Sequence, residues 1–406
     1  MAVKNKKPEI RFKGFAGDWE HRKFSETFTK ISNNTLSRAE LNYNSGLAKN
    51  IHYGDILIKF GELLDIKRDE LPYITDDFLS NKFKSSKLQI GDVIMADAAE
   101  DEMVGKCTEL VNVGEEIIVS GLHTIPSRPT QFFASGYLGY FMNSPVYHNQ
   151  LLRLMQGTKV LSISKTTLQD TAINYPIDGE EQSQIGTFFK NLDHLLTLHQ
   201  QKVNKLVTIK KAMLEKMFPK NGANVPEIRF KGFTEDWVEK KIKDVCLIST
   251  GKSNTQDRVD DGIYPFYVRS PIIERSNRYL YNEEAVLTVG DGVGTGKVFH
   301  YVSGKYDLHQ RVYRMFDFND GISGKYFYYY FSNHFYDRVM AMTAKTSVDS
   351  VRYEMISEMD IEFPSQKEQI LITFLFNNMD HLINLQKKEL EKLKNLKKAF
   401  LEKMFV

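Results

Sequence analysis

The chain has 406 residues, 42% of them hydrophobic and 26% charged, and its formal net charge is only +2. This length allows two or three domains with their own cores, and the composition excludes a chain that is disordered throughout. No window approaches the roughly 20 apolar residues of a membrane-spanning helix, and the basic start lacks the apolar stretch of a secretory signal. We therefore expect no membrane partner and a cytoplasmic location.

The cysteine and histidine patterns give no sign of a metal site. Cys107 and Cys246 are the only cysteines and lie far apart in sequence, so they predict plain thiols rather than a disulfide framework or a zinc site. No HExxH motif is present. We expect no metal bound by this chain.

The chain contains one frame twice. Residues 8–15 (PEIRFKGF) return unchanged at 226–233, and residues 210–218 (KKAMLEKMF) return as KKAFLEKMF at 397–405. The opening copies are 218 residues apart and the closing copies 187, so the first copy is 31 residues longer, nearly all of it between residues 20 and 104. A repeated frame around divergent interiors predicts two similar modules that do different versions of one job.

The sequence predicts the first module at residues 1–177 and one long helix at residues 178–218. Gly-Asp turns separate short β-rich runs at 56–58, 92–95 and 116–119, which is typical of a mixed α/β module. Asp178 and Glu181 have the spacing of a capping box at the helix start. Apolar residues then recur at helical spacing without an interrupting proline. The candidates on this helix for helix pairing or subunit docking are Leu192, Leu195, Leu206, Ile209 and Met213.

The second copy follows the same order. A short linker at 219–225 leads into the second module at 226–364, whose aromatic helix near 325–340 favours core packing over base stacking. Residues 365–406 predict the second long helix. Its candidates for helix pairing or subunit docking are Ile383, Leu390, Leu393, Leu396 and Phe400.

Each long helix needs a partner for its apolar stripe, and the other helix is the obvious one. Rods of roughly 55 to 60 Å follow from their lengths. The expected fold class is α+β: two mixed α/β modules and two long antiparallel helices in a coiled coil, with a pseudo-twofold internal repeat. We also expect the end of the second helix to lie beside the first module.

The order of these features resembles the specificity subunit of a type I restriction-modification system. The resemblance rests on the RFKGF opening followed by Asp18-Trp19 or Asp236-Trp237, a variable module, a long helix that ends in LEKMF, and a repeat of the whole. It covers the entire chain. The Gly-Asp turns, the Gly105-Lys106 turn and the Leu122-His123 segment also resemble the target recognition domains of this family.

The resemblance implies that DNA recognition and catalysis belong to different subunits. Each target recognition domain would read one half of a split double-stranded DNA sequence, and the paired helices would fix the distance between the halves and dock two methyltransferase subunits. Catalysis would belong to partners: adenine methylation with S-adenosylmethionine in the methyltransferase subunits, and translocation and cleavage with ATP and Mg in restriction subunits. The chain itself would bind no cofactor.

Base-reading candidates follow from side-chain chemistry, because arginine and lysine suit guanine edges and phosphates. In the first module they are Lys59, Lys82, Lys84, Lys106, Arg128 and Lys159, and in the second Arg258, Arg269, Arg275, Arg278, Lys297, Arg311 and Lys345. Some of them will contact only phosphate or belong to surface ion pairs. The lysine-rich stretches at 199–220 and 386–406 fit either a solvated helix face or a surface that faces phosphate or a subunit.

Catalysis by this chain is disfavoured. The string GDGVGTGK at 290–297 is not a phosphate loop, because Asp291 stands where a glycine is needed and Val298 where Ser or Thr is needed. A tight hairpin that brings Lys297 to a phosphate and a purely structural hairpin both fit. Asp193-His194 recurs as Asp380-His381 on the other helix, which favours packing or docking over acid–base chemistry. The alternative function is a tandem-repeat scaffold that binds protein partners instead of DNA.

Overall fold

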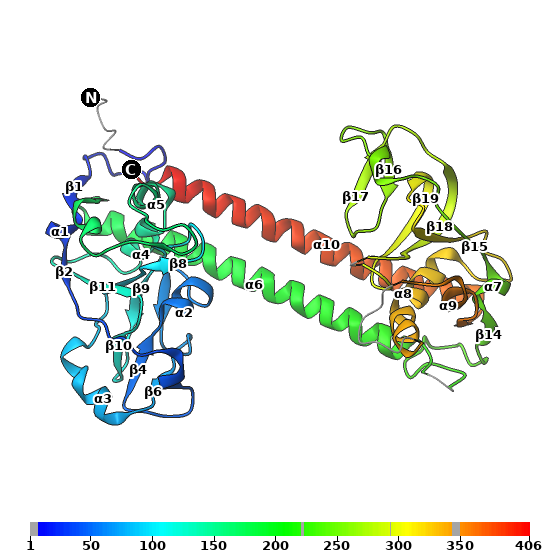
Figure 1. The fold of residues 1–406 in the computed structure, drawn as a ribbon, viewed down its shortest axis with the longest axis horizontal. Helices are drawn as coiled ribbons and strands as arrows, with labels where there is room; N and C mark the ends of the chain where they lie inside the picture. The colour runs from blue at the N-terminus through cyan, green and yellow to red at the C-terminus, as the bar shows by residue number, and fades with distance from the viewer. Residues whose placement is uncertain (1–6, 221–222, 293, 343–349) are drawn as a thin grey trace. The chain divides into compact units, whose positions relative to one another are not determined.

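The computed structural model describes residues 7–220, 223–292, 294–342 and 350–406, and it contains two compact units (Figure 1). Unit 1 combines Met1–His199 with Glu389–Val406, and unit 2 is Gln200–Lys388. Two long helices, α6 (Gly179–Met217) and α10 (Gln366–Lys403), each contribute one part to unit 1 and the other part to unit 2. Among the described residues no helix is both long and apolar enough to cross a membrane.

Unit 1 is built around a five-stranded sheet. Its strand order is β2 (Phe28–Lys30), β11 (Thr124–Pro129), β7 (Val93–Ala96), β9 (Cys107–Asn112) and β5 (Leu63–Asp65). A second sheet has the order β10 (Ile117–Ser120), β4 (Ala48–Ile51), β6 (Tyr73–Ile74) and β3 (Leu41–Asn42). Two strand pairs complete it: β1 (Glu20–Lys23) with β13 (Ala172–Tyr175), and β8 (Ala98–Ala99) with β12 (Leu161–Ser162). The shorter helices are α1 (Phe24–Thr27), α2 (Tyr53–Ile58), α3 (Asp77–Lys82), α4 (Tyr137–Met142) and α5 (Pro145–Leu152), with 3-10 turns at Arg38–Glu40, Lys84–Ser86 and Thr167–Asp170.

Unit 2 is built around a six-stranded sheet. Its order is β15 (Leu247–Thr250), β20 (Val312–Phe316), β18 (Tyr281–Val289), β19 (Phe299–Leu308), β16 (Tyr264–Tyr267) and β17 (Ile273–Ser276). The strand β14 (Val238–Lys241) pairs with β21 (Asp360–Phe363). The helices are α7 (Ile242–Val245), α8 (Gly324–Ala341) and α9 (Tyr353–Ser357), with a 3-10 turn at Thr255–Asp257.

The two central sheets have equivalent strand orders. The series β2-β11-β7-β9-β5 in unit 1 corresponds to β15-β20-β18-β19-β16 in unit 2, and in both units the last two strands pair in parallel. The described part of unit 2 has no counterpart to the sheet β10-β4-β6-β3 of unit 1. The predicted internal repeat and mixed α/β fold class are therefore confirmed, and the extra length of the first copy adds a sheet beside a common core.

A regular seam runs along both long helices. On α6, the buried and half-buried seam residues alternate four and three positions apart, and adding 187 to each gives the seam of α10. The α6 series is Ile185, Phe189, Leu192, Leu196, His199, Val203, Leu206, Lys210, Met213 and Met217, and the α10 series is Ile372, Phe376, Met379, Ile383, Gln386, Leu390, Leu393, Lys397, Phe400 and Met404. A mean spacing of 3.5 residues is the period of a left-handed coiled coil.

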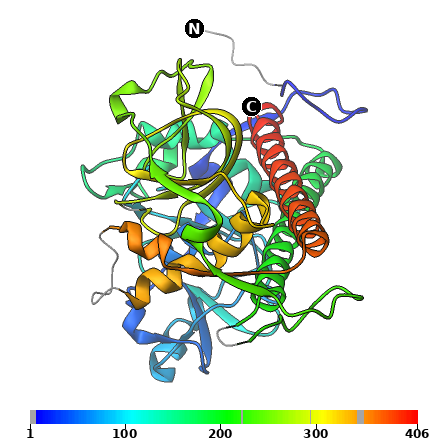
Figure 2. The ribbon, with the colours of Figure 1, turned by 90° about the vertical axis from the view of Figure 1, so that its right-hand side faces the viewer.

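The pairing is antiparallel within each unit (Figures 1 and 2). In unit 1 the ring of Phe188, near the start of α6, lies 4.9 Å from that of Phe400, near the end of α10. In unit 2 Lys210, near the end of α6, forms an ion pair with Asp380 in the first half of α10. Seven of the ten candidates for helix pairing or subunit docking lie on the seam. Leu195, Ile209 and Leu396 lie off it, with 42–44% of each exposed, so they do not pair the helices.

The last residues of the chain belong to the core of unit 1, as predicted. The backbone N–H of Ile10 donates to the carbonyl of Lys403 at 3.0 Å. Phe405 is 3% exposed, and its ring contacts those of Trp19, Tyr137, Phe141 and Phe189. The equivalent residue of unit 2, Phe218, contacts Trp237, Tyr326, Tyr330 and Phe376. Each long helix therefore ends in a buried aromatic anchor.

The start of each helix is held by the repeated signature. Glu181 was expected to complete a capping box, but its carboxylate instead accepts hydrogen bonds from Nε and Nη2 of Arg11 at 2.7 and 2.8 Å. Arg229 and Glu368 form the same bidentate pair in unit 2, at 2.9 Å for both bonds. Both glutamate side chains are 1% exposed. A charge at this depth needs its partner, so the arginine of the RFKGF motif is explained by the glutamate that it covers.

Truncating the aromatic anchor should destabilise unit 1. We expect Phe405→Ala to lower the free energy of unfolding by about 3–5 kcal/mol, because it empties a packed aromatic site. The chain has only two tryptophans, Trp19 in unit 1 and Trp237 in unit 2, so Trp19 fluorescence during urea unfolding in a Trp237→Phe background reports unit 1. Phe132→Ala is the control, since Phe132 also lies in unit 1 and is 79% exposed. Equal effects of the two variants would contradict the anchor.

A pair of like charges weakens unit 2 at high pH. Glu362 on β21 lies directly opposite Glu239 on β14, and burial, followed by Glu239 and Asp360, raises the pKa of Glu362 to about 7 from an ordinary 4.5. Because the folded pKa is the higher one, the free energy of unfolding should fall as pH rises from about 4.5 to 7.

Replacing this carboxylate should remove the pH-dependent cost. We expect Glu362→Gln to raise the midpoint of thermal unfolding of unit 2 by a few degrees at pH 8 and to leave it unchanged near pH 4.5. Trp237 fluorescence in a Trp19→Phe background measures it, with the exposed Glu235→Gln as control. A gain of the same size at both pH values would disprove the titration of Glu362.

Candidate nucleic-acid interface

Equivalent strand ends in the two units carry basic side chains held by an aspartate. In unit 1, Ala96 of β7 pairs with Thr124 of β11, and beyond this pair the N–H of Asp97 donates to the carbonyl of His123 at 3.1 Å. In unit 2, Val289 of β18 pairs with Val312 of β20, and the N–H of Gly290 donates to the carbonyl of Arg311 at 2.8 Å. His123 and Arg311 therefore occupy the same place, immediately before the second strand of the pair.

The unit 1 strand end presents an oriented histidine. His123 Nδ1 lies 3.1 Å from Asp97 Oδ1, and half of the histidine side chain is exposed. Its φ of 54° is left-handed, a conformation that costs a residue with a Cβ roughly 1–2 kcal/mol. The ring of Tyr53 packs edge-on against the imidazole at 5.2 Å. Beside Tyr53, burial lowers the pKa of His52.

Two more polar groups lie at this end of unit 1. Lys165 Nζ donates to Asn33 Oδ1 at 2.7 Å, and Asn33 Nδ2 donates to the carbonyl of Gly121 at 3.2 Å, two residues before His123. Burial lowers the pKa of Lys165, while the charge of Asp97 opposes this shift. Exposed His123 and half-buried Asn33 and Lys165 together form a set of hydrogen-bonding groups suited to nucleic acid.

The unit 2 strand end presents two arginines. Asp291 Oδ1 lies 3.4 Å from Nη1 of Arg269, and Oδ2 lies 3.8 Å from Nε of Arg311. The aspartate is 27% exposed, close to the 25% of Asp97, and the arginines are 48% and 65% exposed. Nearby, burial lowers the pKa of His309. This strand end therefore presents the N–H donors of two guanidinium groups, whereas the strand end of unit 1 presents an imidazole.

The other candidates of the first module lie at several places. Lys59 faces α6, where it lines a cavity of about 590 Å³ with Lys190 and His194. Lys106 is half-buried and donates to the carbonyl of Leu57, and burial lowers its pKa. Lys82 lies over the exposed ring of Phe78, and Lys84 and Lys159 are exposed. The structure does not bring these lysines together at one site.

Two arginine candidates each lie against a buried aspartate. Arg128 binds Asp92 through Nε and Nη2 at 2.8 and 2.7 Å, and the aspartate is 1% exposed. Arg278 binds Asp257 at 2.9 Å and lies 3.5 Å from Asp307, which is fully buried. These contacts give both arginines a structural role in their units.

The remaining second-module candidates are more accessible. Arg258 pairs with Asp260 and Glu274, and Lys297 lies over the ring of Tyr336 at 4.7 Å. Arg275 is exposed on the edge strand β17 and has no ion pair with any described residue. Lys345 lies outside the described residues. The strands β18 and β19 pair antiparallel, and residues 290–298 connect them, so this connection is longer than the tight hairpin that we expected.

The aspartates beside His194 and His381 are part of repeated ion clusters. Lys397 on the α10 seam binds Asp193 of α6 and Glu62, and Tyr140 of α4 donates to Asp193 at 2.7 Å. Burial and the charge of Glu62 raise the pKa of Asp193. In unit 2, Lys210 binds Asp380, which accepts from Tyr329 of α8 at 2.9 Å. These clusters join the module to the helix pair, which explains the repeated aspartates by packing.

Sequence reasoning missed His123, Asp97, Asn33 and Lys165. A signal for His123 existed, because Leu122-His123 recurs as Leu308-His309, but it gave no side-chain direction. The other three meet only through strand pairing. In the described part of the chain no group of three or more His, Cys, Asp or Glu side chains is arranged to hold a metal ion.

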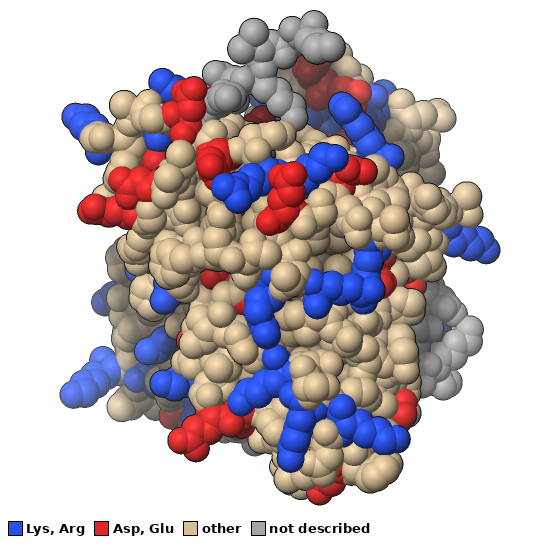
Figure 3. All heavy atoms as spheres, turned by 90° about the vertical axis from the view of Figure 1, so that its left-hand side faces the viewer, with Lys and Arg blue, Asp and Glu red and all other residues tan. Residues whose placement is uncertain are grey.

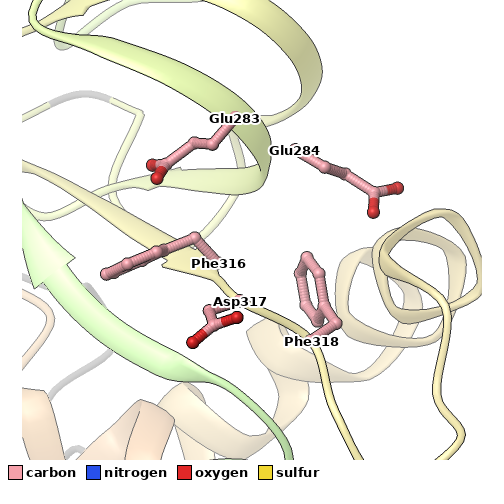
Figure 4. Close-up of a pocket in the computed structure, with 5 residues that line it drawn as sticks. All are labelled: Glu283, Glu284, Phe316, Asp317 and Phe318. Carbon is pink, nitrogen blue, oxygen red and sulfur yellow. The ribbon is translucent and has the colours of Figure 1, made fainter.

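Charge is unevenly distributed over the surface. Lys and Arg side chains form a band across the middle and lower part of the face of unit 1 in Figure 3, with most Asp and Glu above it or at its edges. A cavity of about 360 Å³ in unit 2 is instead acidic, lined by Glu283, Glu284, Asp317, Phe316 and Phe318 (Figure 4). That cavity would repel phosphate, so it lies outside the candidate interface.

The fold agrees with the comparisons to known proteins. A family model described as a type I restriction modification DNA specificity domain matches residues 16–208 and again residues 234–395. The chain belongs to this family. Each of the two specificity domains contains one of the strand ends described above, and each extends into one of the long helices.

Relatives and solved structures cover most of the chain at low identity. The MjaVIII specificity subunit of Methanocaldococcus jannaschii is 21% identical over 81% of this chain and 84% of its own. The crystal structure of the S subunit from M. genitalium has a TM-score of 0.65 at 13% identity, covering 98% of this chain and 99% of that chain. A structure described for complex assembly and conformational transition of the type I system has a TM-score of 0.57 at 16% identity, covering 94% and 96%. The likeness to these structures concerns the fold.

The ion pairs predict which arginine side chains stabilise their unit and which do not. We expect Arg128→Ala to destabilise unit 1 by about 2 kcal/mol, because it leaves the buried Asp92 carboxylate unpaired. Arg275→Ala should change the stability of unit 2 by less than about 0.5 kcal/mol. Urea unfolding followed through Trp19 or Trp237 alone measures each effect. An Arg128→Ala protein as stable as the parent would show that the pair does not support the fold.

Proposed function

We propose that this chain is the DNA-recognition subunit of a type I restriction-modification complex and has no catalytic activity of its own. One observation carries the proposal: two specificity domains share a sheet order but present different side chains at equivalent strand ends, His123 in one and Arg269 with Arg311 in the other. Two domains that share a fold but present different side chains suit a bipartite DNA site whose two halves differ. We therefore propose an asymmetric rather than a palindromic target.

The long helices would set the distance between the half-sites and dock two methyltransferase subunits. Leu195 and Leu198 on α6 recur, 187 residues later, as Leu382 and Leu385 on α10, and each is 42–48% exposed. Repeated apolar positions on the outside of a coiled coil offer equivalent docking surfaces to two identical partners. Restriction subunits would complete the assembly in the cytoplasm. S-adenosylmethionine, ATP and Mg would bind to the partner subunits.

Sequencing of modified adenines tests this function. A host that expresses the chain with its methyltransferase partner should carry methyladenine in one split, asymmetric motif, and a host with the methyltransferase alone should not. The chain-dependent motif is the readout, and loss of modification on deleting the chain is the control. If both hosts have the same modification pattern, the proposal is wrong.

Salt dependence separates DNA recognition from the scaffold alternative. The complex should bind a duplex that contains the motif, and its affinity should fall steeply between 50 and 200 mM salt, because phosphate contacts release counterions. A protein scaffold would bind the same duplex weakly at every salt concentration.

A further inference from the structure

The equivalent strand ends differ in hydrogen-bonding chemistry, and this difference has a consequence for the bases that each unit can accept. A carboxylate only accepts hydrogen bonds, so Nδ1 of His123 must donate to Asp97. The free nitrogen is then Nε2, which no described residue bonds and which is an acceptor when the ring is neutral. In unit 2 the guanidinium groups of Arg269 and Arg311 only donate.

These chemistries match different base edges. An acceptor suits the exocyclic amino group of adenine or cytosine, and a guanidinium suits O6 and N7 of guanine. On the basis of the proposed function, we propose that His123 reads an amino-bearing base, adenine or cytosine, in the half-site of unit 1. Arg311 reads a guanine at the equivalent position of the other half-site. Asp97 and Asp291 act as positioning residues that aim these two side chains.

The geometry supports aimed side chains rather than chance surface charges. Both aspartates follow the first strand of an equivalent pair and are about one quarter exposed, and both reading residues directly precede the second strand. His123 also keeps a left-handed backbone, which is strained for a residue with a Cβ. The ring of this strained residue is held by Asp97 on one side and by Tyr53 on the other. The side chain therefore points in a single direction.

The groups around His123 are consistent with a role in which its outer nitrogen stays available. Asp97 and Tyr53 contact the ring directly, and His52 lies beside Tyr53. Lys165, held by Asn33, lies close enough to Asp97 for their charges to interact. Lys165 can therefore approach a phosphate while His123 meets a base edge, a combination of backbone contact and base contact that specific readers use.

The test uses the complete complex and duplexes in which each base pair of the identified motif is replaced in turn. For His123→Gly, in which glycine tolerates the left-handed backbone, we expect discrimination to fall about 10-fold at one position of one half-site. That position should hold adenine or cytosine in the preferred sequence. Arg311→Ala should relax one guanine position in the other half-site by a similar factor.

Base analogues and double variants test the mechanism directly. Replacing that guanine with 7-deazaguanine removes N7, so it should weaken binding by the parent complex but not by the Arg311→Ala complex. Asp97→Asn and Asp291→Asn should weaken discrimination at the same positions as His123→Gly and Arg311→Ala, respectively. Each double variant should be no worse than the variant of the reading residue alone, since a positioning residue acts only through its partner.

Matched control variants remove one carboxylate charge, as Asp97→Asn and Asp291→Asn do, but at residues that form no ion pair with His123 or Arg311. Glu100→Gln lies directly after β8, three residues beyond Asp97, and Asp261→Asn lies in unit 2; both carboxylates are exposed and form no ion pair with a described residue. Both controls should keep the discrimination of the parent, and thermal unfolding of every variant should stay within a few degrees of it.

Three outcomes would overturn the inference: uniform weakening across all duplexes, no change on replacing His123 or Arg311, or additive double variants. A parent complex that shows no sequence preference at all would instead overturn the proposed function, so the two failures are distinguishable.

Discussion

The coiled-coil seam of α6 and α10 is the constraint on which both units depend. Its period of 3.5 residues holds along the described length of each helix, and every seam position of α6 has its counterpart 187 residues later. The aromatic anchors Phe218 and Phe405, one residue beyond the last seam position, insert into the core of a unit. The seam and the module cores are therefore continuous hydrophobic structures, and neither would be fully buried without the other.

Two lysines stand at equivalent positions of the apolar seam. Each finds its charged and aromatic partners only where the two long helices meet a helix of the module. Lys397 needs Asp193 from α6 and lies near Tyr140 from α4, and Lys210 needs Asp380 and lies near Tyr329 from α8. An apolar residue at either place could be equally stable, because desolvation offsets much of the attraction within a buried ion pair. A buried lysine, however, accepts only the alignment that brings its aspartate within reach, which adds specificity to the packing of helix against module.

The sequence predicted the frame, whereas the base-reading candidates stay predictions, and the difference has a physical reason. The exact repeat and the helical periodicity determined the two helices, because both are local properties of the chain. Leu195, Ile209 and Leu396 fit the same helical pattern but lie off the seam, since several leucines satisfy a 3.6-residue period while only a 3.5-residue series stays on one partner. Arg128 and Lys106 resembled readers by residue type. Their burial depends on Asp92 and on the carbonyl of Leu57, and strand pairing and chain packing bring these partners near them.

The strand ends of the candidate interface arise from long-range pairing that no local pattern encodes. Asp97 and His123 are 26 residues apart, and they meet because β7 ends where β11 begins. Asp291 is 22 residues from Arg269, which reaches it from the segment after β16. Strand ends also tolerate change better than the sheet, since their side chains point to solvent and leave the hydrogen-bonded ladder intact. A duplicated sheet can therefore keep one architecture while its two ends diverge, one toward an imidazole and the other toward guanidinium groups. The asymmetry of the readers is thus compatible with the symmetry of the frame, because the two properties depend on different parts of each unit.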